Sequence, residues 1–495
     1  MNLKQWCNLD EILYSSQTDE EYKQYAGLDF RKEIIKGLAE AKIINSGIFI
    51  NFISQPRPLL LGAIEDIAYS KTKMLELELH DIRNEKVTSS KYKFDGSPVN
   101  WSSWRQFNSN EKESAKRKEV FDEFISKTKY VAPIVESRFS SIKQIYKEYD
   151  SIKAEISGTT GARLDPVSCY LEQENISYEK LIDFVKAIGQ RAKKPFKDAL
   201  DVVGKSILGA EPNYYDDFYF FRNKIYSDLD DSFSSIEPVV EVQRILTNME
   251  FDLSKIHFDT EDRRNKYPSP ICFFVNVPND IRILYKKESP YFDFQACFHE
   301  TGHAMHASSI DPQNEYWDKY RVPMGIAEIF SIFLERLTKN PDYISPLIDP
   351  LNDNKHDDTI TKLTSRNKFM ELFFVTFYAA NSLMKLEYWK ESLSIDHACK
   401  LYSRLIKEYT GFEIPGEYWL LHHILPESIM YVPSYLLAAV RAAELNTYMR
   451  DRFGDKWWKE KQSGRKLREI MGPGGSIDLS YFSKLDTSTF LKEIT

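Results

Sequence analysis

The 495-residue sequence contains few cysteines, few histidines and no long apolar run. Its five cysteines are odd in number and widely spaced, which argues against a disulfide framework and favours a reducing compartment. No stretch of roughly 18 apolar residues occurs, and the start "MNLKQWCNLDEILYSS" lacks a basic segment followed by an apolar one. We therefore expect a cytoplasmic protein with no secretory signal and no membrane partner.

An excess of positive charge is also absent. The net charge is −8, and no basic stripe alternates with aromatic residues, which excludes a protein that binds nucleic acid by electrostatics. Hydrophobic residues make up 42% and charged residues 28% of the chain, a balance typical of a globular protein with a large core. The length allows one large domain or two to three ordinary ones.

Most of the chain has the pattern of helices. Residues 110–156 place apolar positions three and four apart among dense mixed charge, which indicates solvated helix faces. Residues 166–206 favour a further helical pair. The helical pattern breaks at "GAEPNYYDD", after about residue 200. We predict a mainly α-helical protein with a helical amino-terminal region over residues 1–200 and a second region over residues 201–495.

Strand signals gather in one place. "ICFFVNV", at 271–277, and "IRILYKK", at 281–287, are rich in β-branched and aromatic residues and flank the turn "PND". The pattern predicts a β-hairpin, and hence a small sheet just before residue 299. An exposed edge of such a hairpin could bind an extended peptide through main-chain hydrogen bonds.

The segment "ACFHETGHAMHASS" concentrates three of the chain's nine histidines and contains the pattern H-E-x-x-H. On a helix, His299 and His303 lie on one face about 5–6 Å apart at Cβ, so their ring nitrogens can meet at one ion. Glu300 is rotated by about 100° and can reach a water on the ion instead of the ion itself. The pattern therefore predicts a zinc site with a general base. A helix that is rich in histidine by chance is the alternative.

A catalytic zinc usually has three protein ligands. One class of sites extends the motif with a glycine and a third histidine, but His306 and Ser309 occupy those positions. The other class uses a glutamate from a following helix. "PMGIAEIFSIFLERL" predicts a buried helix around Glu328, which needs a partner there. Zinc and a buried salt bridge both remain open. Gly302, costly within a helix, indicates close approach by another element.

"HETGHAMH", followed by Glu328 and then by Glu335, resembles the thimet oligopeptidase and oligoendopeptidase F family of zinc metallopeptidases. The similarity extends over about residues 255–482. It includes "DTEDRRNKYP", with Asn265 where the family has glycine, and the glycine-rich "IMGPGGSIDLSYF".

The resemblance implies an activity and a set of roles. His299, His303 and Glu328 would bind one Zn²⁺ per chain, and Glu300 would be the general base. His306 and Glu335 match positions that support the ligands. The resemblance also implies a large two-lobed helical body with a deep groove or channel that admits short peptides as substrates.

The stretch 418–443, "YWLLHHILPESIMYVPSYLLAAVRAA", is similar to the part of the family that carries a histidine followed by tyrosines. The resemblance implies His423, in preference to His422, and Tyr435, in preference to Tyr431, as groups that stabilise the oxyanion. Pro433 stands where the family often has a tyrosine. Packing of a buried helix is the alternative role for both tyrosines.

We therefore predict a zinc-dependent oligoendopeptidase that cuts internal bonds of short peptides. A metallocarboxypeptidase of the related helical type is the first alternative, and it would need a basic group such as Arg441 or Arg336 to hold the free carboxylate. A non-catalytic, zinc-stabilised peptide-binding protein, with His306 as a fourth ligand, is the second.

Overall fold

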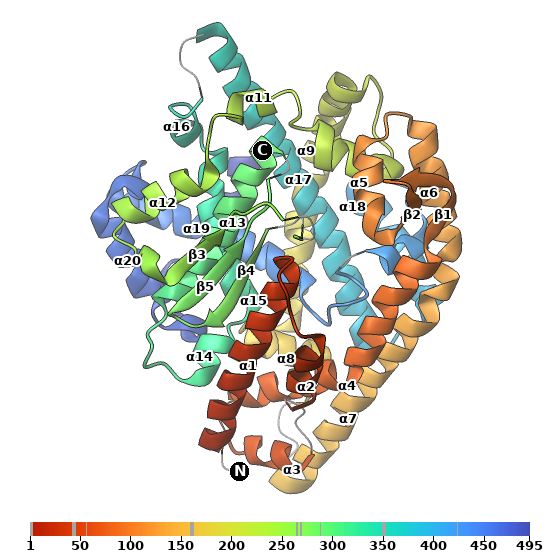
Figure 1. Ribbon diagram of the computed structural model, residues 1–495, viewed down its shortest axis with the longest axis vertical. Helices are drawn as coiled ribbons and strands as arrows, with labels where there is room; N and C mark the ends of the chain where they lie inside the picture. The colour runs from red at the N-terminus through yellow and green to blue at the C-terminus, as the bar shows by residue number, and fades with distance from the viewer. Residues whose placement is uncertain are drawn as a thin grey trace. The chain divides into compact units, whose positions relative to one another are not determined.

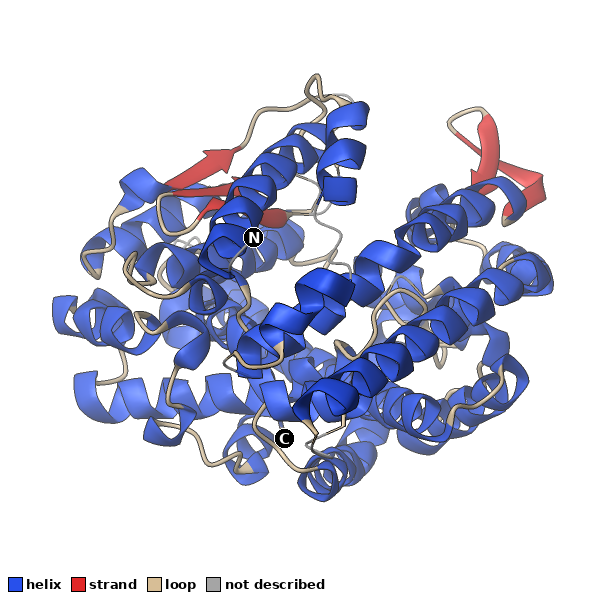
Figure 2. Ribbon diagram, turned by 90° about the horizontal axis from the view of Figure 1, so that it is seen from below, coloured by secondary structure: helices blue, strands red, loops and turns tan. Residues whose placement is uncertain are grey.

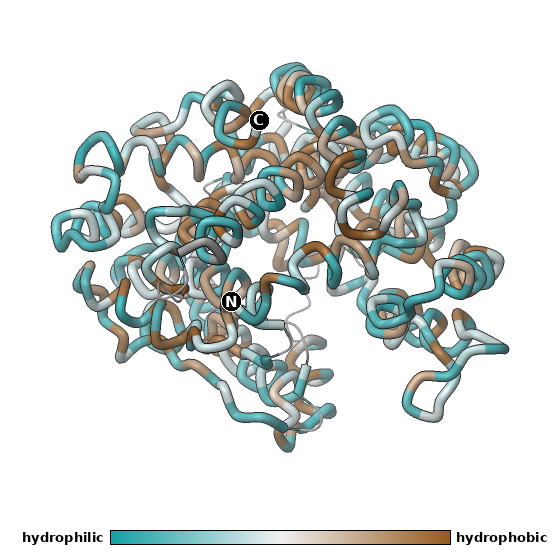
Figure 3. The backbone as a smooth tube through the Cα atoms, turned by 90° about the horizontal axis from the view of Figure 1, so that it is seen from above, coloured by the Kyte–Doolittle hydropathy of each residue, from teal (hydrophilic) through white to brown (hydrophobic). Residues whose placement is uncertain are grey.

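The computed structural model describes residues 3–41, 46–55, 57–158, 163–263, 266–267, 270–287, 289–348, 353–422 and 424–495. Most of these residues lie in helices, and strands form two small sheets (Figure 2). Hydrophobic and hydrophilic residues alternate along the helices, as amphipathic helices require (Figure 3). The predicted mainly helical fold with a small sheet is confirmed. Within the described ranges, no helix is long and apolar enough to cross a membrane.

The chain divides into two compact units, each built from separate segments. Unit 1 comprises Met1–Ser70, Leu229–Thr364 and Leu437–Phe490, and unit 2 comprises Lys71–Asp228, Ser365–Leu436 and Leu491–Thr495. Residue 200, where the sequence suggested a boundary, lies inside helix α9 (Tyr178–Leu208). Both units draw on segments from either side of that residue, so the division into 1–200 and 201–495 stays a prediction and does not describe these units.

Unit 2 is helical apart from one hairpin. Its elements are the second half of α4 (Arg57–Lys86), β1 (Thr88–Phe94), β2 (Ser97–Asn100), α5 (Trp101–Asn110), α6 (Ser114–Lys127), α7 (Ala132–Ser157), α8 (Pro166–Gln173), α9, α10 (Asp217–Tyr219), most of α17 (Asp353–Glu391), α18 (Ile395–Thr410) and the start of α19 (Val432–Phe453) (Figure 1). The predicted helical stretch 110–156 is thus two helices, α6 and α7, and the predicted pair over 166–206 is α8 and α9.

Unit 1 surrounds the second sheet. Its helices are α1 (Leu3–Tyr25), α2 (Lys32–Ala41), α3 (Ser46–Phe49), the start of α4, α11 (Asp230–Phe233), α12 (Pro238–Asn248), α13 (Pro290–Ser309), α14 (Tyr316–Tyr320), α15 (Met324–Glu335), α16 (Pro341–Ile344), the start of α17, most of α19, α20 (Lys461–Met471) and the start of α21 (Thr487–Ile494). Its strands are β3 (Ile256–Asp259), β4 (Ile271–Asn276) and β5 (Asp280–Leu284).

The sheet of unit 1 has the order β3-β5-β4. Strands β4 and β5 form the predicted antiparallel hairpin, and β3 adds to β5 in parallel. Side chains of β4 alternate between two faces. Phe273 and Val275 pack with Ala26, which follows α1, whereas the Phe274 ring lies 6.4 Å from that of His303 on α13. The sheet therefore lies between α1 and α13, the helix that carries the H-E-x-x-H motif (Figure 1).

Candidate metal centre

The two helices that carry the motif and Glu328 begin at prolines. Pro290 opens α13, where its missing N–H is not needed, and the Asp293 carboxylate accepts a hydrogen bond from the Ser289 backbone N–H at 3.0 Å. Pro323 is the N-cap residue of α15, which begins at Met324, one residue after the proline at which the sequence predicts its start. These signals fix where each helix begins, and hence which side chains share a face.

Gly302 brings α13 and α15 into close contact. A Cβ atom at this position would lie 2.3 Å from the Phe330 carbonyl oxygen and 2.5 Å from the Ser331 Cα. Only glycine allows the backbones to approach this closely. The predicted close approach at Gly302 is confirmed, and α15 is the element that makes it.

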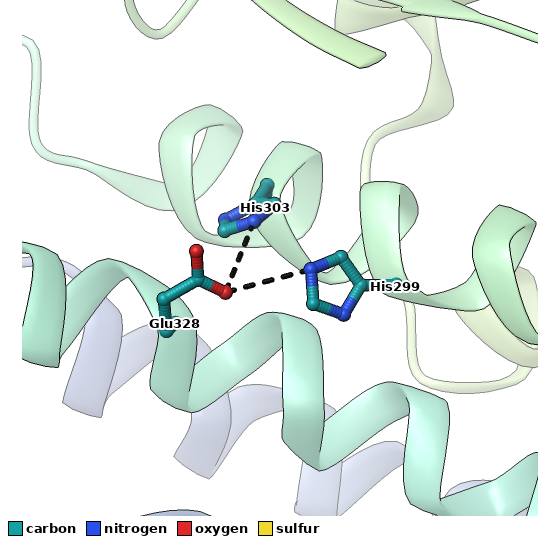
Figure 4. A group of neighbouring side chains, drawn as sticks. All are labelled: His299, His303 and Glu328. Carbon is teal, nitrogen blue, oxygen red and sulfur yellow. Dashed lines mark ion pairs between the residues drawn. The ribbon is translucent and has the colours of Figure 1, made fainter. Parts of the chain in front are cut away.

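This approach brings two histidines and a glutamate together. His299 and His303, four residues apart on α13, present rings with centroids 5.1 Å apart, and Glu328 projects toward them from α15 (Figure 4). One donor atom from each of the three residues lies within 4.8 Å of the other two. Across the ranges that the structure describes, this is the one group of histidine, cysteine or carboxylate side chains with such spacing.

The distances within this group fit a metal ion better than direct hydrogen bonds. The Glu328 Oε2 atom lies 3.4 Å from the His299 Nε2 atom and 3.5 Å from the His303 Nε2 atom. Hydrogen bonds of this kind are usually about 2.7–3.2 Å long. Donors arranged tetrahedrally around an ion at about 2.0–2.2 Å are about 3.3–3.6 Å apart. The donor set and its spacing therefore match a zinc site of the His-His-Glu type.

Further side chains orient the group from outside. The Glu335 Oε2 atom lies 2.9 Å from the His299 Nδ1 atom, and the Lys339 Nζ atom lies 2.7 Å from the Glu335 Oε1 atom. The Ser331 hydroxyl donates to Glu328 Oε2 at 2.8 Å. Burial alone would raise the pKa of Glu335, but Lys339 and His299 outweigh it and hold this pKa at about 2. A carboxylate on the far nitrogen fixes the ring and tautomer of a metal-binding histidine.

Sequence reasoning placed Glu335 and missed Lys339 and Ser331. Their helical spacing was the available signal, because Lys339 lies four residues after Glu335 and Ser331 three after Glu328.

Glu300 lies beside the group and outside it. Burial raises the pKa of its carboxyl to about 7, with Glu328 adding to the rise, while His299 and a hydrogen bond from the Cys272 backbone act in the opposite direction. The contact with Cys272 places Glu300 against strand β4. This is the location expected of a carboxylate that serves the centre without binding the ion.

His306 does not join the donor group. Its ring lies 4.5 Å from that of Phe330, and burial lowers its pKa to about 3. Its Nε2 atom has no hydrogen-bond partner among the described residues. A supporting role for His306 stays a prediction.

The residues predicted to stabilise the oxyanion belong to unit 2. His423 lies outside the described residues. His422 is buried, and its Nδ1 atom accepts hydrogen bonds from the backbone N–H groups of Ile424, at 3.1 Å, and Leu425, at 3.4 Å. His422 thus has a structural task in the turn that follows it.

The two tyrosines of this region pack together. The Tyr431 and Tyr435 rings lie 4.7 Å apart, and Tyr435 also contacts Tyr378, with ring centroids 5.1 Å apart. These contacts fit the packing alternative, and catalytic roles for Tyr431 and Tyr435 stay predictions.

The segment matched to "DTEDRRNKYP" forms an ion-pair cluster at the end of β3. The Lys266 Nζ atom donates to the Asp259 carboxylate at 3.0 Å and to its carbonyl oxygen at 2.7 Å, and Arg263 pairs with the same carboxylate. The Tyr22 hydroxyl donates to it at 2.8 Å. These residues tie α1 to the sheet, a structural role that explains their pattern. Asn265 lies outside the described residues.

Solved structures with the same fold include three peptidases. An M32 carboxypeptidase from Deinococcus radiodurans R1 is 13% identical with a TM-score of 0.60, over 99% of this chain and 96% of that chain. A Pyrococcus furiosus carboxypeptidase is 14% identical with a TM-score of 0.60, and the match covers 100% of this chain and 98% of the carboxypeptidase. PZ peptidase A, solved with an inhibitor, is 13% identical with a TM-score of 0.60, and the match covers 96% of this chain and 85% of PZ peptidase A. At these identities the likeness shows the fold.

A search of curated protein sequences found no significant match to this chain. The family model for peptidase family M3, in contrast, matches residues 99–478, which is well over half of the chain and includes the whole His299, His303 and Glu328 group. The match begins far ahead of residue 255, where sequence reasoning placed the start of the resemblance. The chain therefore belongs to peptidase family M3.

Proposed function

We propose that this protein is a zinc-dependent endopeptidase that hydrolyses internal bonds of short peptides. The observation that carries the proposal is the group of His299, His303 and Glu328. The Glu328 Oε2 atom lies 3.4 Å from the His299 Nε2 atom and 3.5 Å from the His303 Nε2 atom, and Glu300 lies beside this group. Membership of peptidase family M3 supports the reaction class.

The donor set supports zinc as the metal, one per chain. Two imidazole nitrogens and one carboxylate oxygen would hold the ion, and this is the donor set typical of catalytic zinc. A zinc ion held there supplies Lewis acidity, which lowers the pKa of a water molecule and polarises the peptide carbonyl.

The side chains have distinct tasks in this proposal. Glu300 accepts a proton from the attacking water at its carboxylate and passes it to the leaving amine. Glu335 holds the His299 ring by its Nδ1–H. His423 and Tyr435, with Tyr431 as the less favoured residue, donate hydrogen bonds to the developing oxyanion. The structural task of His422 supports His423 as the catalytic histidine of the pair.

Strand β4 supplies a place for the peptide backbone. Within the described residues β4 pairs with β5 alone, so its other edge is open to a further strand. The Cys272 backbone contact with Glu300 lies along this strand. A peptide that adds to this edge would be held by main-chain hydrogen bonds, independently of its sequence.

The runner-up is a metallocarboxypeptidase, and two of the solved structures with the same fold are carboxypeptidases. Such an enzyme needs a cation for the free carboxylate of its substrate. Arg441 is buried and donates to the Gly325 carbonyl oxygen at 2.8 Å, and Arg336 lies over the Phe490 ring. These contacts give both arginines structural roles, which supports the endopeptidase.

Mass spectrometry of products from peptides about 5 to 40 residues long would test the proposal. The wild-type protein, a chelator-treated sample and Glu300→Gln would be compared, with Glu391→Gln at the exposed end of α17 as the matched control. We expect internal cuts in the short peptides, restored by Zn²⁺ after chelation and reduced about 10²–10⁴-fold in Glu300→Gln alone. Single residues released from the carboxyl end would establish the carboxypeptidase. Stoichiometric zinc without any cut would leave a zinc-stabilised peptide-binding protein.

A further inference from the structure

The chain between α13 and α15, residues 310–323, contains α14 and is called here the α14 connection (Figure 1). It leads from the helix of His299 and His303 to the helix of Glu328, so the place where it ends sets the start of α15. Connecting segments usually run over the surface and are more mobile than the helices they join. The α14 connection is instead held by two separate parts of unit 1.

The first anchor is a set of ion pairs at Arg321, two residues before Pro323. The Arg321 Nη1 atom donates to the Asp66 carboxylate at 2.6 Å, and its Nη2 atom donates to the other Asp66 oxygen and, at 3.2 Å, to Asp10. Asp10 lies on α1, and Asp66 lies on the part of α4 that belongs to unit 1. A guanidinium that binds a carboxylate through two nitrogens is fixed in direction as well as in position. Arg321 therefore ties the end of the α14 connection to two helices at once.

Helix α1 also packs along α14. The Trp6 and Tyr316 rings lie 6.1 Å apart, and the Tyr14 and Tyr320 rings lie 5.0 Å apart. The Tyr320 hydroxyl donates to the Glu11 carboxylate at 3.2 Å. An isolated ion pair at the surface contributes little to stability. The pairs at Arg321 belong to a more extended contact between α1 and α14.

The second anchor is the glycine-rich segment 472–476, which follows α20 and was singled out in the sequence. The Gly472 carbonyl oxygen accepts two hydrogen bonds from the α14 connection. One comes from the Asp311 backbone N–H at 3.0 Å, and the other comes from the Asn314 side chain at 2.7 Å. The start of the α14 connection is thereby tied to the carboxyl-terminal part of unit 1.

Gly474 brings this segment into contact with the backbone of α14. Its φ angle is 62°, and a Cβ atom there would lie 2.1 Å from the Asp318 carbonyl oxygen and 3.3 Å from the Ile310 Cγ2 atom. The Ser476 hydroxyl donates to the Asp318 carboxylate at 2.5 Å. Both the positive φ and the close backbone oxygen require glycine at position 474.

The start of α15 decides where Glu328 lies along and around that helix. Each residue of an α-helix advances by about 1.5 Å and turns by about 100°, so a shift of the first turn moves Glu328 by the same amount. The contact at Gly302 limits how closely α13 and α15 approach, whereas the two anchors act on the beginning of α15. Arg441 of α19 adds to them, because it donates to the Gly325 carbonyl oxygen at 2.8 Å.

We infer that Arg321 and Gly474 are positioning residues that fix the start of α15 and thereby bring Glu328 to His299 and His303. The inference rests on the zinc site of the proposed function, and it does not depend on which peptide bonds are cut. Donor atoms that lie near their final positions before the ion arrives bind it more tightly. Loosening either anchor should therefore weaken zinc binding beyond what a general loss of stability explains.

The first anchor can be tested at Arg321. Arg321→Met removes the ion pairs and keeps a long side chain, and Arg321→Lys restores the charge without the planar group that binds a carboxylate through two nitrogens. Arg282→Met is the matched control. Arg282 also pairs with α1, through Asp19, and its side chain is 24% exposed against 21% for Arg321, but it lies on β5, outside the α14 connection.

The second anchor can be tested with Gly474→Ala. Gly454→Ala is the matched control, because Gly454 belongs to the same unit and has a φ angle of 81°, so alanine causes the same kind of backbone strain. No atom lies within 4 Å of the ideal Cβ of Gly454. The comparison separates the contact with α14 from the strain of a positive φ.

Three quantities would be measured for each variant: zinc affinity by chelator competition, hydrogen exchange in the zinc-free protein, and the temperature of thermal unfolding. We expect Arg321→Met and Gly474→Ala to bind zinc about 10–100-fold more weakly than the wild type. We expect the amides of residues 326–331 to exchange about tenfold faster in both variants without zinc. Arg321→Lys should recover part of the zinc affinity. Arg282→Met and Gly454→Ala should keep the wild-type zinc affinity and exchange in α15, even where they unfold at a lower temperature.

Wild-type zinc affinity in Arg321→Met or in Gly474→Ala would overturn the role inferred for that residue. A matched control that loses as much zinc affinity would do the same, since general destabilisation would then explain the loss. If Arg321→Met does not fold, Arg321→Lys and Gly474→Ala decide by the same criteria.

Failure of the proposed function gives a different result. A wild-type protein that binds no zinc overturns both the proposed function and this inference. A wild-type protein that binds zinc and cuts no peptide overturns the peptidase alone, because zinc affinity still reports on the placement of Glu328.

Discussion

Gly302 allows α13 and α15 to bring His299, His303 and Glu328 together because it has no side chain. The sequence already marked it as an expensive residue in a helix, and the 2.3 Å distance from its ideal Cβ to the Phe330 oxygen gives the reason. The neighbouring atoms are backbone, so they cannot rotate away. The spacing of His299, His303 and Glu328 therefore depends on this position as well as on the three side chains themselves.

Replacing Gly302 with alanine should push α15 away from α13. We expect a loss of about 1–3 kcal/mol in stability, as in overpacked cores, and zinc binding at least about tenfold weaker. Thermal unfolding and chelator competition would measure the two effects. Gly37→Ala on α2 is the control, because no atom lies within 4 Å of its ideal Cβ. That variant should be as stable as the wild type or slightly more so. Wild-type zinc affinity in Gly302→Ala would contradict the argument.

Glu335 offers a second prediction at the scale of one residue. Glu335→Gln removes the charge that faces the His299 Nδ1 atom, so zinc affinity should fall about 10–100-fold. Lys339→Met removes the ion pair behind Glu335 but leaves the bond to His299, and it should weaken zinc binding less. Competition with a chromophoric chelator would rank the three proteins. An equal or larger loss in Lys339→Met would show that the bond to His299 is not what matters.

Strand β4 brings the sheet to the candidate metal centre. Its Cys272 backbone contacts Glu300, and its Phe274 ring faces His303 on α13. Residues two apart on a strand direct their N–H groups to the same side, so the Phe274 N–H points to the edge that the Cys272 N–H faces. This edge is where we expect a peptide to add.

Phe274→Pro should remove one main-chain donor from that edge. We expect KM for peptides to rise about twofold to tenfold at unchanged zinc content, since one hydrogen bond contributes about 0.5–1.5 kcal/mol. Phe274→Ala separates the loss of the ring from the loss of the N–H, and it should have the smaller effect on KM. Steady-state kinetics and metal analysis would measure both. Loss of zinc from the proline variant would make β4 a structural support instead.

The elements that sequence reasoning located are those with local signals. The β4–β5 hairpin is predictable because its two strands are separated by a short turn, and α15 because a proline starts it. Strand β3 is not predictable in this way, because its parallel partner β5 lies further away in sequence and no tight turn connects the two strands. The β1–β2 hairpin also carries a local signal, the Asp95-Gly96 turn with positive φ at both residues, so this hairpin is predictable in principle.

The same limit applies to the candidate site. His299, Glu300 and His303 lie on one helix, so their spacing alone indicates a metal site. Glu328 required a judgement about a second helix, and the distance between the two helices is fixed only by packing at Gly302.

All three proposed zinc ligands belong to unit 1. Removing the ion should therefore affect this unit first. We expect chelation to raise hydrogen exchange in α13 and α15, because a ligand stabilises the state that binds it by about 3–4 kcal/mol at 100 to 1,000 times its Kd. Helices α9 and α18 of unit 2 should change little. Exchange measured with and without Zn²⁺ would test this, and an equal rise in both units would contradict it.

The division of unit 1 into three segments has a consequence for its synthesis. A ribosome that has made His299, His303 and Glu328 has not yet made Arg441, which holds the Gly325 carbonyl at the start of α15. It has also not made Gly464, the residue at which α20 packs against the end of α12. An added Cβ at Gly464 would lie 1.9 Å from the Met249 carbonyl oxygen. The growing chain thus carries the three proposed zinc ligands for some time before the residues that pack around them have been made. A chaperone that binds α13 and α15 during translation would therefore bind them in this period, before the segment Leu437–Phe490 has been synthesised.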